Sequence, residues 1–584
     1  MNGQAKNHGD LNDENRTLVN QESPDQRKNS GTKAADATNE LYPEIHHFDE
    51  VLQHIGNAGP YQVRIYFLLC MVAVVEALTA YAIVFIEETP KHRCQVPGLD
   101  NDTWVIQGPG HEALINASIP RDRRGKYAEC TVRTSNGTEV KCSNWVYDTS
   151  TFTTTYPSQF NLVCDKAELL SVTSMVFFGS ALAGGLFLGI LSDTVGRKTT
   201  LVIALLGQGI TGVVAIFAPT IEVYMIIRFL LGAFSSGIFN PCFTLALEFY
   251  GPKQRMVAGS VINFFCATGG PLTTLLAYFL RDWRHFQLAV TLPTFLVLVT
   301  MWYVPESPRW LLSRGKRRRA EKILRTAARV NGRVLAPNVL NNVVIEEESP
   351  SVSFRELFRA PKVILRMLML SYAWLIVDTT YYGIGLHTGN LGGDIFVNYL
   401  CLGLIEYPAF VICFTIDRFG RKKPYILCML LGGLACVCSI FVELYANEEL
   451  KWLHVVLAVA GKFGAAAVYG IHFIWAAEIY PTVIRNFAMG VGATVANIGT
   501  MVSPFIVRNI KVDSIGPSTI PMIIFGAASI SAAILVGFLP ETTNINLPET
   551  LEDAQNLGRK QSTHKKKIRH DEDKDLIAQK ETQL

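Results

Sequence analysis

The stretches "LSDTVGRKTT" (residues 191–200) and "TIDRFGRKKP" (residues 415–424) share one pattern: an Asp, two further residues and then Gly-Arg-Lys. Each stretch interrupts a long and almost uncharged run of sequence. A chance loop at Asp193 would not recur in the same setting at Asp417. The recurrence therefore indicates that the chain is internally duplicated.

Two further features repeat at nearly the same spacing. Glu248 and Arg255 in "EFYGPKQR" match Glu478 and Arg485 in "EIYPTVIR". The segment "PESP", which begins at Pro305, matches "PETT", which begins at Pro540. Each feature joins one apolar run to the run six places further on. The sequence therefore predicts two homologous halves of six helices each.

The composition places these halves in a membrane. Of the 584 residues 49% are hydrophobic and only 18% are charged, and the charge gathers in both tails, one early loop and one central loop. The uncharged runs between them reach the ~20 residues that a bilayer-spanning helix needs. We predict an all-α membrane protein with twelve spans, near 63–86, 168–192, 198–217, 221–246, 256–279, 284–304, 366–387, 394–416, 424–445, 451–476, 484–508 and 519–539.

The loops that carry Lys and Arg fall on one side of the predicted bundle, with "RDWRH" (281–285) as the exception. Positive loops face the cytoplasm, so we expect both termini there. The segment 1–40 is polar and lacks the apolar core of a signal peptide, which favours a disordered tail. The predicted parts are a tail (1–60), a first half (61–304), a cytoplasmic helical loop (305–365), a second half (366–539) and a second tail (540–584).

The loop at 87–167 must then face the outside. It contains three N-glycosylation acceptors, at Asn101, Asn116 and Asn136. It also contains four cysteines, an even number that suits an oxidising compartment. They are Cys94, Cys130, Cys142 and Cys164, and their spacing leaves all three possible pairings open.

The repeated charges suit a conformational latch. Carboxylates and guanidinium groups at the cytoplasmic helix ends form charge-assisted hydrogen bonds. Such a network would hold the halves together while the cavity opens outward and would break when the cavity opens inward. The alternative is that the charges only follow the topological bias. The predicted latch residues are Asp193, Arg197, Glu248, Arg255, Asp417, Arg421, Glu478 and Arg485.

Ionisable residues inside predicted spans are candidates for substrate contact, because charge is costly in a bilayer. Glu76, Asp378, Glu406 and Lys462 are of this kind. For Asp378 and Glu406 an internal ion pair or hydrogen-bond network is an equal alternative. Aromatic residues on the same or neighbouring spans would form a partial cage for an ammonium group. They are Trp374, Tyr381, Tyr382, Tyr469 and Trp475.

Other motifs carry less. "GQGITG" (207–212) matches a dinucleotide fingerprint but lies in an apolar helix, so we expect its glycines, and those of "GLFLG" (185–189), to allow close helix packing. No Walker A or His-Glu-x-x-His sequence is present, which argues against an ATP pump and a zinc enzyme. The carboxy-terminal "ETQL", with Thr582 and Leu584, fits a PDZ scaffold partner, although such matches are frequent by chance.

Over about residues 50–545 the chain resembles the organic cation, anion and zwitterion transporters of the major facilitator superfamily. The stretches that carry the resemblance are "NLVCD" (161–165), "PESPRWLLSRGK" (305–316) and "AEIYPTVIRN" (477–486). The stretches 381–410 and "GKFG" (461–464) are most similar to the carnitine and ergothioneine branch. The resemblance implies a substrate site between the halves at mid-membrane depth.

One position departs from the family. Its organic cation transporters carry an Asp in the eleventh span, eleven residues after the Arg-Asn pair, and its anion transporters carry an Arg, whereas this chain has Asn497. The resemblance implies that Glu76 replaces a polar Asn of the carnitine branch, where it would attract an ammonium group. Lys462 would then accept a substrate carboxylate or a chloride ion.

We therefore expect a plasma-membrane transporter of organic cations or zwitterions, carnitine-like compounds or amines, that works by alternating access. An organic anion transporter of the same family and a transporter-like receptor that binds ligand without moving it stay open as alternatives. The chain shows no catalytic constellation, so we do not expect an enzyme. We expect no metal, cofactor or nucleic-acid partner; a coupling ion, Na⁺ or H⁺, stays open.

Overall fold

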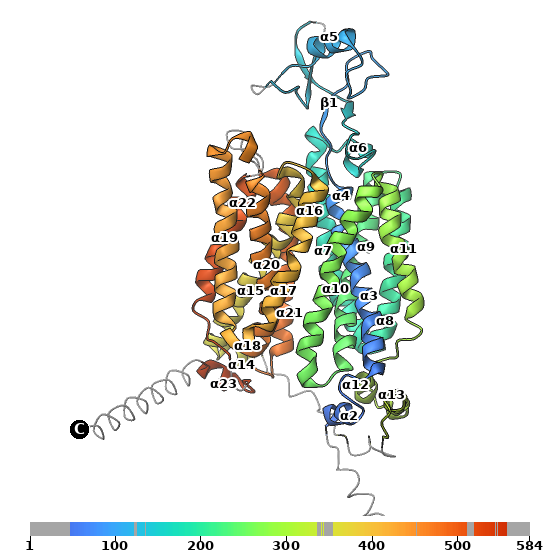
Figure 1. Ribbon diagram of the computed structural model, residues 1–584, viewed down its shortest axis with the longest axis vertical. Helices are drawn as coiled ribbons and strands as arrows, with labels where there is room; N and C mark the ends of the chain where they lie inside the picture. Colours follow the sequence, from blue (N-terminus) through green and yellow to red (C-terminus); the bar gives the residue numbers. More distant parts are fainter. Residues whose placement is uncertain are drawn as a thin grey trace, which may run out of the picture.

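The computed structural model describes residues 47–121, 125–134, 136–335, 354–450, 452–510, 519–543 and 547–557, together with 340, 343 and 545. The predicted disordered tail and the PDZ motif at Thr582 and Leu584 lie outside these residues. The described chain is an upright helical bundle with a small domain at one end (Figure 1). We name the end that carries this domain the loop face, and the opposite end the tail face.

Each half of the bundle contributes six spans. The first half contains α3 (Pro60–Tyr81) continued by α4 (Ile83–Ile86), α7 (Ala167–Val195), α8 (Arg197–Val214), α9 (Ile221–Glu248), α10 (Pro252–Phe279) and α11 (Trp283–Thr300). The second half contains α15 (Pro361–Leu386), α16 (Ile395–Leu404) continued by α17 (Glu406–Val411), α19 (Lys422–Tyr445), α20 (Leu453–Ile479), α21 (Arg485–Asn509) and α22 (Thr519–Val536). The predicted all-α fold is confirmed.

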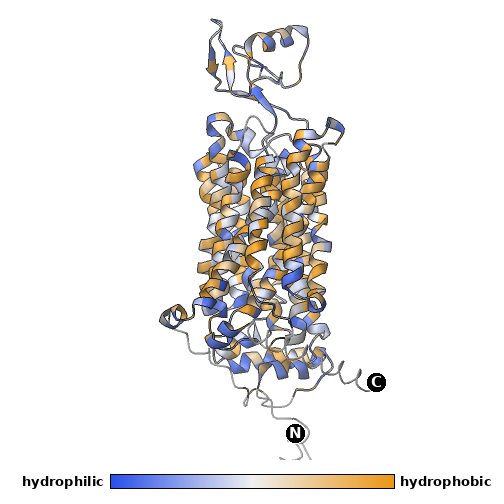
Figure 2. Cartoon of the chain, turned by 90° about the vertical axis from the view of Figure 1, so that its left-hand side faces the viewer, coloured by the Kyte–Doolittle hydropathy of each residue, from blue (hydrophilic) through white to orange (hydrophobic). Residues whose placement is uncertain are grey.

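Eleven of these spans are long and apolar enough to cross a membrane. The remaining span, α11, lies in the same bundle but begins with Trp283, Arg284 and His285, which lower its mean hydropathy. Figure 2 shows hydrophobic residues along the whole height of the helices, with hydrophilic residues gathered at the tail face and in the small domain. The bundle therefore places its polar ends outside the hydrocarbon layer of a bilayer.

Local sequence explains where several helices begin. The Asp282 carboxylate accepts hydrogen bonds from the first backbone N–H groups of α11, and Asp394 does the same for α16. The chain reverses between α7 and α8 at Gly196, with φ +124°, and before α19 at Gly420, with φ +87°. These positive φ values favour glycine, so the Gly of both Gly-Arg-Lys motifs is required by the turn.

Glycines also set how closely helices pack. A Cβ on Gly207 would lie 2.5 Å from the Phe234 ring of α9, and one on Gly212 would lie 2.6 Å from Thr291 of α11. The predicted packing role of "GQGITG" is thus confirmed. For Gly185 and Gly189 it is wrong, because a Cβ on either glycine would have no described atom of another residue within 4 Å.

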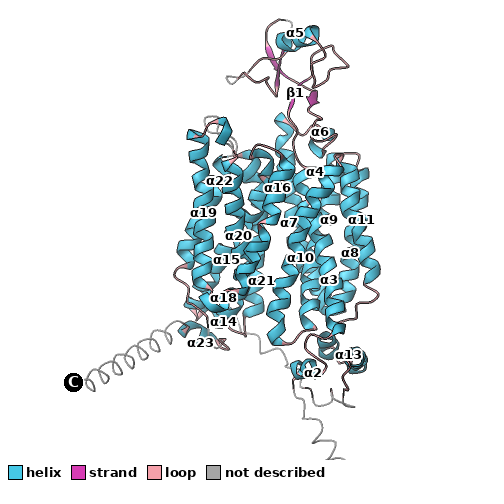
Figure 3. Cartoon of the chain, viewed as in Figure 1, coloured by secondary structure: helices cyan, strands magenta, loops and turns pink. Residues whose placement is uncertain are grey.

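The small domain is the loop between α4 and α7. It contains α5 (Pro109–Ser118), α6 (Tyr156–Phe160) and two antiparallel strand pairs, the only strands among the described residues (Figure 3). Strand β1 (His92–Cys94) pairs with β4 (Trp145–Tyr147), and β2 (Thr131–Arg133) pairs with β3 (Glu139–Lys141). Disulfides join Cys94 to Cys142 and Cys130 to Cys164, which selects one of the three pairings that the sequence left open.

At the tail face a second small unit packs beneath the first half. It consists of α2 (Phe48–His54), α12 (Pro308–Ser313) and α13 (Arg317–Val330), whose apolar faces share one core. The central loop that we predict to be helical thus contains α12 and α13, and the apolar side of α13 covers α2 and α12. Short segments complete the chain: α14 (Phe354–Phe358), α18 (Ile416–Phe419), α23 (Leu551–Asn556) and 3₁₀ turns at Cys164–Lys166, Ala215–Phe217, Thr388–Asn390, Ile412–Phe414 and Glu448–Leu450.

The two halves meet along two helix pairs. Helix α7 of the first half packs against α21 of the second, and α10 packs against α16 and α17. The other extensive contacts of the spans lie inside one half, such as α7 with α9 and α15 with α21. The architecture is thus two helical bodies with a seam between them, and the seam is where a substrate site is expected.

Candidate functional site

A cavity of about 240 Å³ lies in the seam between the halves. We take as substrate candidates the four ionisable residues, Asn497 and the aromatic residues Trp374 and Tyr382. The cavity brings six of these seven into one lining: Glu76 on α3, Trp374, Asp378 and Tyr382 on α15, Glu406 on α17 and Asn497 on α21. The seventh, Lys462 on α20, lies behind the lining and contacts Glu406. The sequence-based choice of residues from five different spans thus converges on one place.

Glu406 and Lys462 form a buried ion pair. The Lys462 Nζ lies 3.0 Å from Glu406 Oε1, and both side chains are almost inaccessible to solvent. The Tyr381 hydroxyl donates to Glu406 Oε1 at 2.7 Å, and the Tyr81 hydroxyl of the first half lies 2.9 Å from that of Tyr381. The internal-pair alternative therefore describes Glu406, and Lys462 is engaged within the protein rather than free for a substrate carboxylate.

Glu76 and Asp378 have no such cation. Among the described residues neither carboxylate forms an ion pair. Asp378 Oδ2 accepts a long hydrogen bond of 3.5 Å from Thr500, and Oδ1 has no partner among these residues although Asp378 is only 7% exposed. Glu76 Oε2 accepts a weak hydrogen bond from the Cys266 thiol, with 4.0 Å between sulfur and oxygen. Two acidic side chains thus line the cavity without a paired cation among the described residues.

Aromatic rings cover much of the remaining lining. Tyr381 stacks on Tyr469 with ring centroids 5.8 Å apart, and Tyr382 meets Phe178 of α7 at 5.4 Å. Trp374 packs edge to face on Phe473 at 4.8 Å. The expectation for Trp475 is wrong: this side chain is fully buried, lies outside the cavity lining and packs on Tyr425.

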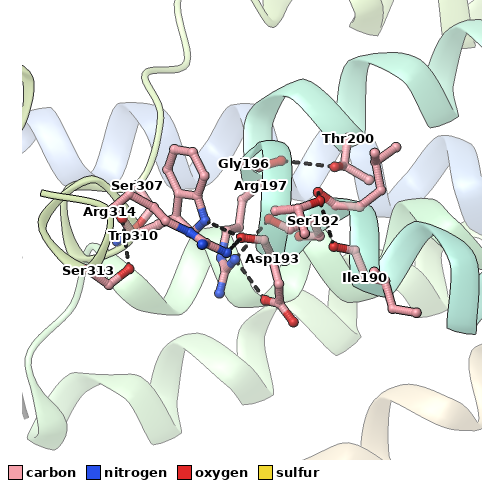
Figure 4. A network of polar contacts seen from close by, with 12 residues as sticks. Ile190, Ser192, Asp193, Gly196, Arg197, Thr200, Ser307, Trp310, Ser313 and Arg314 are labelled. Atoms are coloured by element: carbon pink, nitrogen blue, oxygen red, sulfur yellow. Dashed lines mark hydrogen bonds and ion pairs between the residues drawn. The ribbon is translucent and has the colours of Figure 1, made fainter. Parts of the chain in front are cut away.

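At the tail face the first predicted latch group is assembled around Arg197 (Figure 4). Arg197 Nη1 lies 2.9 Å from the exposed Asp193 carboxylate, and its Nε lies 3.6 Å from Glu248 Oε1 on α9. The Asp193 carbonyl also accepts from Trp310 Nε1 at 2.8 Å and from Arg314 at 2.6 Å. This group therefore ties α7, α8 and α9 to the tail-face unit.

The second half repeats the arrangement. Arg421 lies 2.7 Å from Asp417 and 3.0 Å from Glu478 on α20. Glu541 accepts from the backbone N–H groups of Arg421 and Lys422 at the start of α19. Although partial burial raises the pKa of Glu541, these bonds and the Thr543 hydroxyl outweigh it and hold the pKa below its ordinary value.

Glu541 and its counterpart Glu306 are functional residues that the sequence argument missed. Glu306 Oε1 accepts from the Lys198 backbone N–H at the start of α8, as Glu541 does at α19. Both belong to the "PESP" and "PETT" segments that revealed the repeat, so the duplicated Glu was the available signal. A carboxylate at a helix N-terminus stabilises the exposed N–H groups and the helix dipole.

None of the ion pairs that the described residues give the latch groups joins one half to the other. Arg255 pairs with Asp49 at 2.6 Å, and Arg485 bonds to the Tyr480 carbonyl at 3.3 Å. Within the described part of the chain, neither arginine pairs with the acid seven residues before it. A latch between the halves at this face thus stays a prediction for another conformation.

The halves are instead joined at the loop face, by an ionic cluster that the sequence argument missed. Glu87, after α4, lies 3.2 Å from Arg228 of α9 and 3.1 Å from Arg508 of α21. Arg508 also donates to the Ser174 hydroxyl at 2.6 Å and to the Leu170 carbonyl at 3.1 Å, both on α7. A charged Arg228 within the apolar run of α9 was the signal for this cluster.

Comparison with known proteins identifies the fold and the family. The family described as sugar (and other) transporter matches residues 125–553. An organic cation transporter protein of Drosophila melanogaster is 35% identical over 538 residues, which cover 88% of this chain and 95% of the relative. Solute carrier family 22 member 3 of Mus musculus is 33% identical over 540 residues, with 88% and 96% covered. The chain belongs to solute carrier family 22.

The solved structures show the fold. The inward-open xylose transporter XylE of E. coli superposes with a TM-score of 0.58 at 17% identity, covering 85% of this chain and 99% of that one. Another XylE structure, described as a major facilitator superfamily proton:xylose symporter, gives 0.54. This solute carrier therefore has the major facilitator fold, and it is a transporter rather than an enzyme.

Proposed function

We propose that this solute carrier moves organic cations across the plasma membrane by alternating access. One observation carries the proposal: Glu76 and Asp378 face a cavity between the halves without a cation to compensate them among the described residues. Buried carboxylates are costly unless they are paired, and a bound ammonium group supplies the missing partner. The aromatic rings beside them add cation–π attraction.

The same lining disfavours organic anions. Lys462, which contacts the cavity-lining Glu406, is already paired with it at 3.0 Å. Asn497 offers hydrogen bonds but no charge. A zwitterion of the carnitine type would bring its carboxylate beside Glu76 or Asp378, where the described lining offers neutral donors such as Asn240, Asn263 and Asn497 but no Lys or Arg. Cations without a carboxylate are therefore the favoured substrate class.

The positions of the contacts between the halves support alternating access. At the loop face Arg508 joins the halves, whereas at the tail face the ion pairs of the described residues stay inside each half. The cavity lining begins at Tyr81 and Tyr382, near the loop-face ends of α3 and α15. It extends to Phe239 and Phe473, which lie nearer the tail-face ends of α9 and α20. This arrangement corresponds to a carrier closed at the loop face.

We further propose that the loop face is extracellular and the tail face cytoplasmic. The loop domain contains two disulfides and exposes Asn101, Asn116 and Asn136. Oxidising conditions and N-glycosylation both belong to the secretory route. Loss of a mass shift on glycosidase treatment in the triple Asn→Gln variant would establish glycosylation, and an unglycosylated wild type would refute it.

Uptake into cells that express the protein tests the substrate class. The panel contains small quaternary amines, carnitine and aromatic carboxylates, with Glu222→Gln on the exposed surface of α9 as the matched control. We expect saturable uptake of the quaternary amines, strong loss in Glu76→Gln/Asp378→Asn and none in the control. Uptake confined to carboxylates would contradict the proposal, as would saturable surface binding without accumulation.

Asn497→Asp provides a gain-of-function test in the same panel. It places a carboxylate on α21 in the same cavity. In the Glu76→Gln/Asp378→Asn background we expect it to restore part of the quaternary amine uptake. Replacing external Na⁺ and imposing a pH gradient in the same cells identifies the coupling ion.

A further inference from the structure

The charged residues of the cavity define the substrate class more narrowly than a general preference for cations does. Three carboxylates line it, those of Glu76, Asp378 and Glu406. Lys462 neutralises only one of them, because its ammonium group lies on Glu406. Among the described residues that line the cavity there is no Lys or Arg. The cavity therefore carries two uncompensated acids, and a substrate with one positive charge neutralises only one.

The two acids belong to different halves of the protein. Glu76 lies on α3 and Asp378 on α15, so they approach the cavity from its two walls. Tyr382 and Tyr469 line the cavity together with both carboxylates, and each packs on the ring of Tyr381. The space between the acids is thus bordered by aromatic rings, which suit an apolar or weakly polar spacer.

Asp378 shows that one position is built for a ligand. The residue is more than nine-tenths buried and lines the cavity, yet Oδ1 has no hydrogen-bond partner among the described residues. Buried polar atoms are almost always paired in folded proteins, so an unpaired carboxylate oxygen facing a cavity marks a place for a missing donor. An ammonium group on a bound substrate supplies that donor.

The geometry points to organic dications as preferred substrates: linear molecules with an ammonium group at each end, one on Glu76 and one on Asp378, and a spacer along the tyrosine rings. The inference rests on the proposed cation transport and narrows its substrate class. A monocation would occupy either acid and leave the other bare in a site of low polarity. A dication compensates both and contacts both halves at once.

Matched pairs of compounds test the inference. Hexyltrimethylammonium and 6-aminohexyltrimethylammonium, whose amine is protonated at neutral pH and can donate hydrogen bonds, share a six-carbon chain and differ in the second charged end. In cells that express the wild-type protein we expect the KM of the dication to be at least tenfold lower. Across spacers of three to ten methylene groups we expect an optimum length, because the two acids are fixed in the fold. Surface biotinylation normalises each rate to the protein present.

Single substitutions separate the two anchors. Glu76→Gln and Asp378→Asn should each raise the KM of the dication at least tenfold and remove the length optimum. The KM of the monocation should change less than threefold, because the other carboxylate remains. Glu222→Gln should change neither. Asp378→Glu keeps the charge and should retain dication preference with a shifted optimum, which distinguishes lost charge from a disturbed fold.

Three outcomes would overturn the inference. One is equal KM values for the dication and the monocation in the wild-type protein. Another is a single variant that raises both KM values by the same factor, which would show one shared anchor. The third is affinity that rises steadily with spacer length, which would show simple partitioning of apolar chains. If neither the monocation nor the dication is taken up, the proposed cation transport itself is refuted.

Discussion

Arg508→Ala should shift the carrier toward an arrangement that is open at the loop face. Among the described residues the Arg508 guanidinium forms the ion pair that joins the halves, with bonds to Glu87 at 3.1 Å, Ser174 at 2.6 Å and the Leu170 carbonyl at 3.1 Å. Removal leaves Glu87 compensated by Arg228 at 3.2 Å, so the cost is that of lost bonds rather than of a bare buried charge. A charged hydrogen bond contributes about 1.5–3 kcal/mol.

We therefore expect the closed arrangement to lose about 2–3 kcal/mol relative to one open at the loop face. Since every 1.4 kcal/mol is a factor of ten, the open population rises roughly 30- to 150-fold. Glu87→Gln should act more strongly on folding, because it leaves Arg228 buried with its carboxylate partner neutralised.

Cysteine labelling measures the change. Ser171 lies in this seam, where its hydroxyl donates to Asn509 of α21 at 2.6 Å, and it is only 1% exposed. Ser171→Cys is introduced after the free cysteines that are not buried, Cys266, Cys401 and Cys438, are replaced by Ala. A membrane-impermeant maleimide should label it tens of times faster in Arg508→Ala than in its parent.

Arg284→Ala is the matched control for this experiment. Arg284 is a half-buried arginine at the loop-face end of α11, and its Nε donates to the Ile216 carbonyl within the first half at 3.0 Å. Its removal should leave the labelling rate unchanged. Equal labelling rates in Arg508→Ala and its parent, with both proteins folded, would refute the view that this cluster closes the carrier.

Three further predictions concern the latch groups and the loop domain. Arg421→Ala removes the guanidinium from half-buried Glu478 and should cost about 3 kcal/mol, seen as a lower melting temperature together with a lower maximal rate. Asp193→Asn alters a carboxylate that is 71% exposed, so it should cost less than about 1 kcal/mol; equal losses in both variants would contradict this ranking. Asp102 is buried, which raises its pKa, but bonds from Arg93, the Val96 N–H and His111 outweigh this and lower the pKa from 3.8 to about 2. Because the pKa of Asp102 is lower in the folded state, its stabilisation of the fold is complete above about pH 4 and is lost as the pH falls toward 2. At pH 5 the loop domain of the wild-type protein should therefore resist an acid protease better than that of Asp102→Asn. Near pH 2 the two proteins should be cleaved at similar rates.

The architecture could be predicted from the sequence because its signals are local or periodic. Apolar runs of span length and the repeated Asp193 and Asp417 motifs define twelve helices in two halves without any knowledge of contacts. The same repeat contained the paired acids Glu306 and Glu541, whose role at helix N-termini became visible only in the fold. The cavity acids were found because charge inside an apolar span is rare.

Pairings could not be predicted, because they depend on how distant helices meet. The four loop cysteines allow three connectivities, and only the fold of the domain brings Cys94 to Cys142. Likewise, no feature of the neighbouring sequence shows that Lys462 forms an ion pair with Glu406. The same is true of Asp378, whose Oδ1 has no hydrogen-bond partner among the described residues. Glu87 and Arg508 lie 421 residues apart in the chain, so their contact across the seam has no signature in either sequence neighbourhood.

Uptake by the purified protein in liposomes tests the central claim most directly, because no other carrier is present. With a labelled quaternary amine we predict saturable accumulation by the wild-type protein and by Glu222→Gln, and its loss in Glu76→Gln/Asp378→Asn, while excess benzoate does not compete. Accumulation of the amine that is unchanged in the double variant, or transport of the carboxylate alone, would contradict the assignment of these two acids to cation transport.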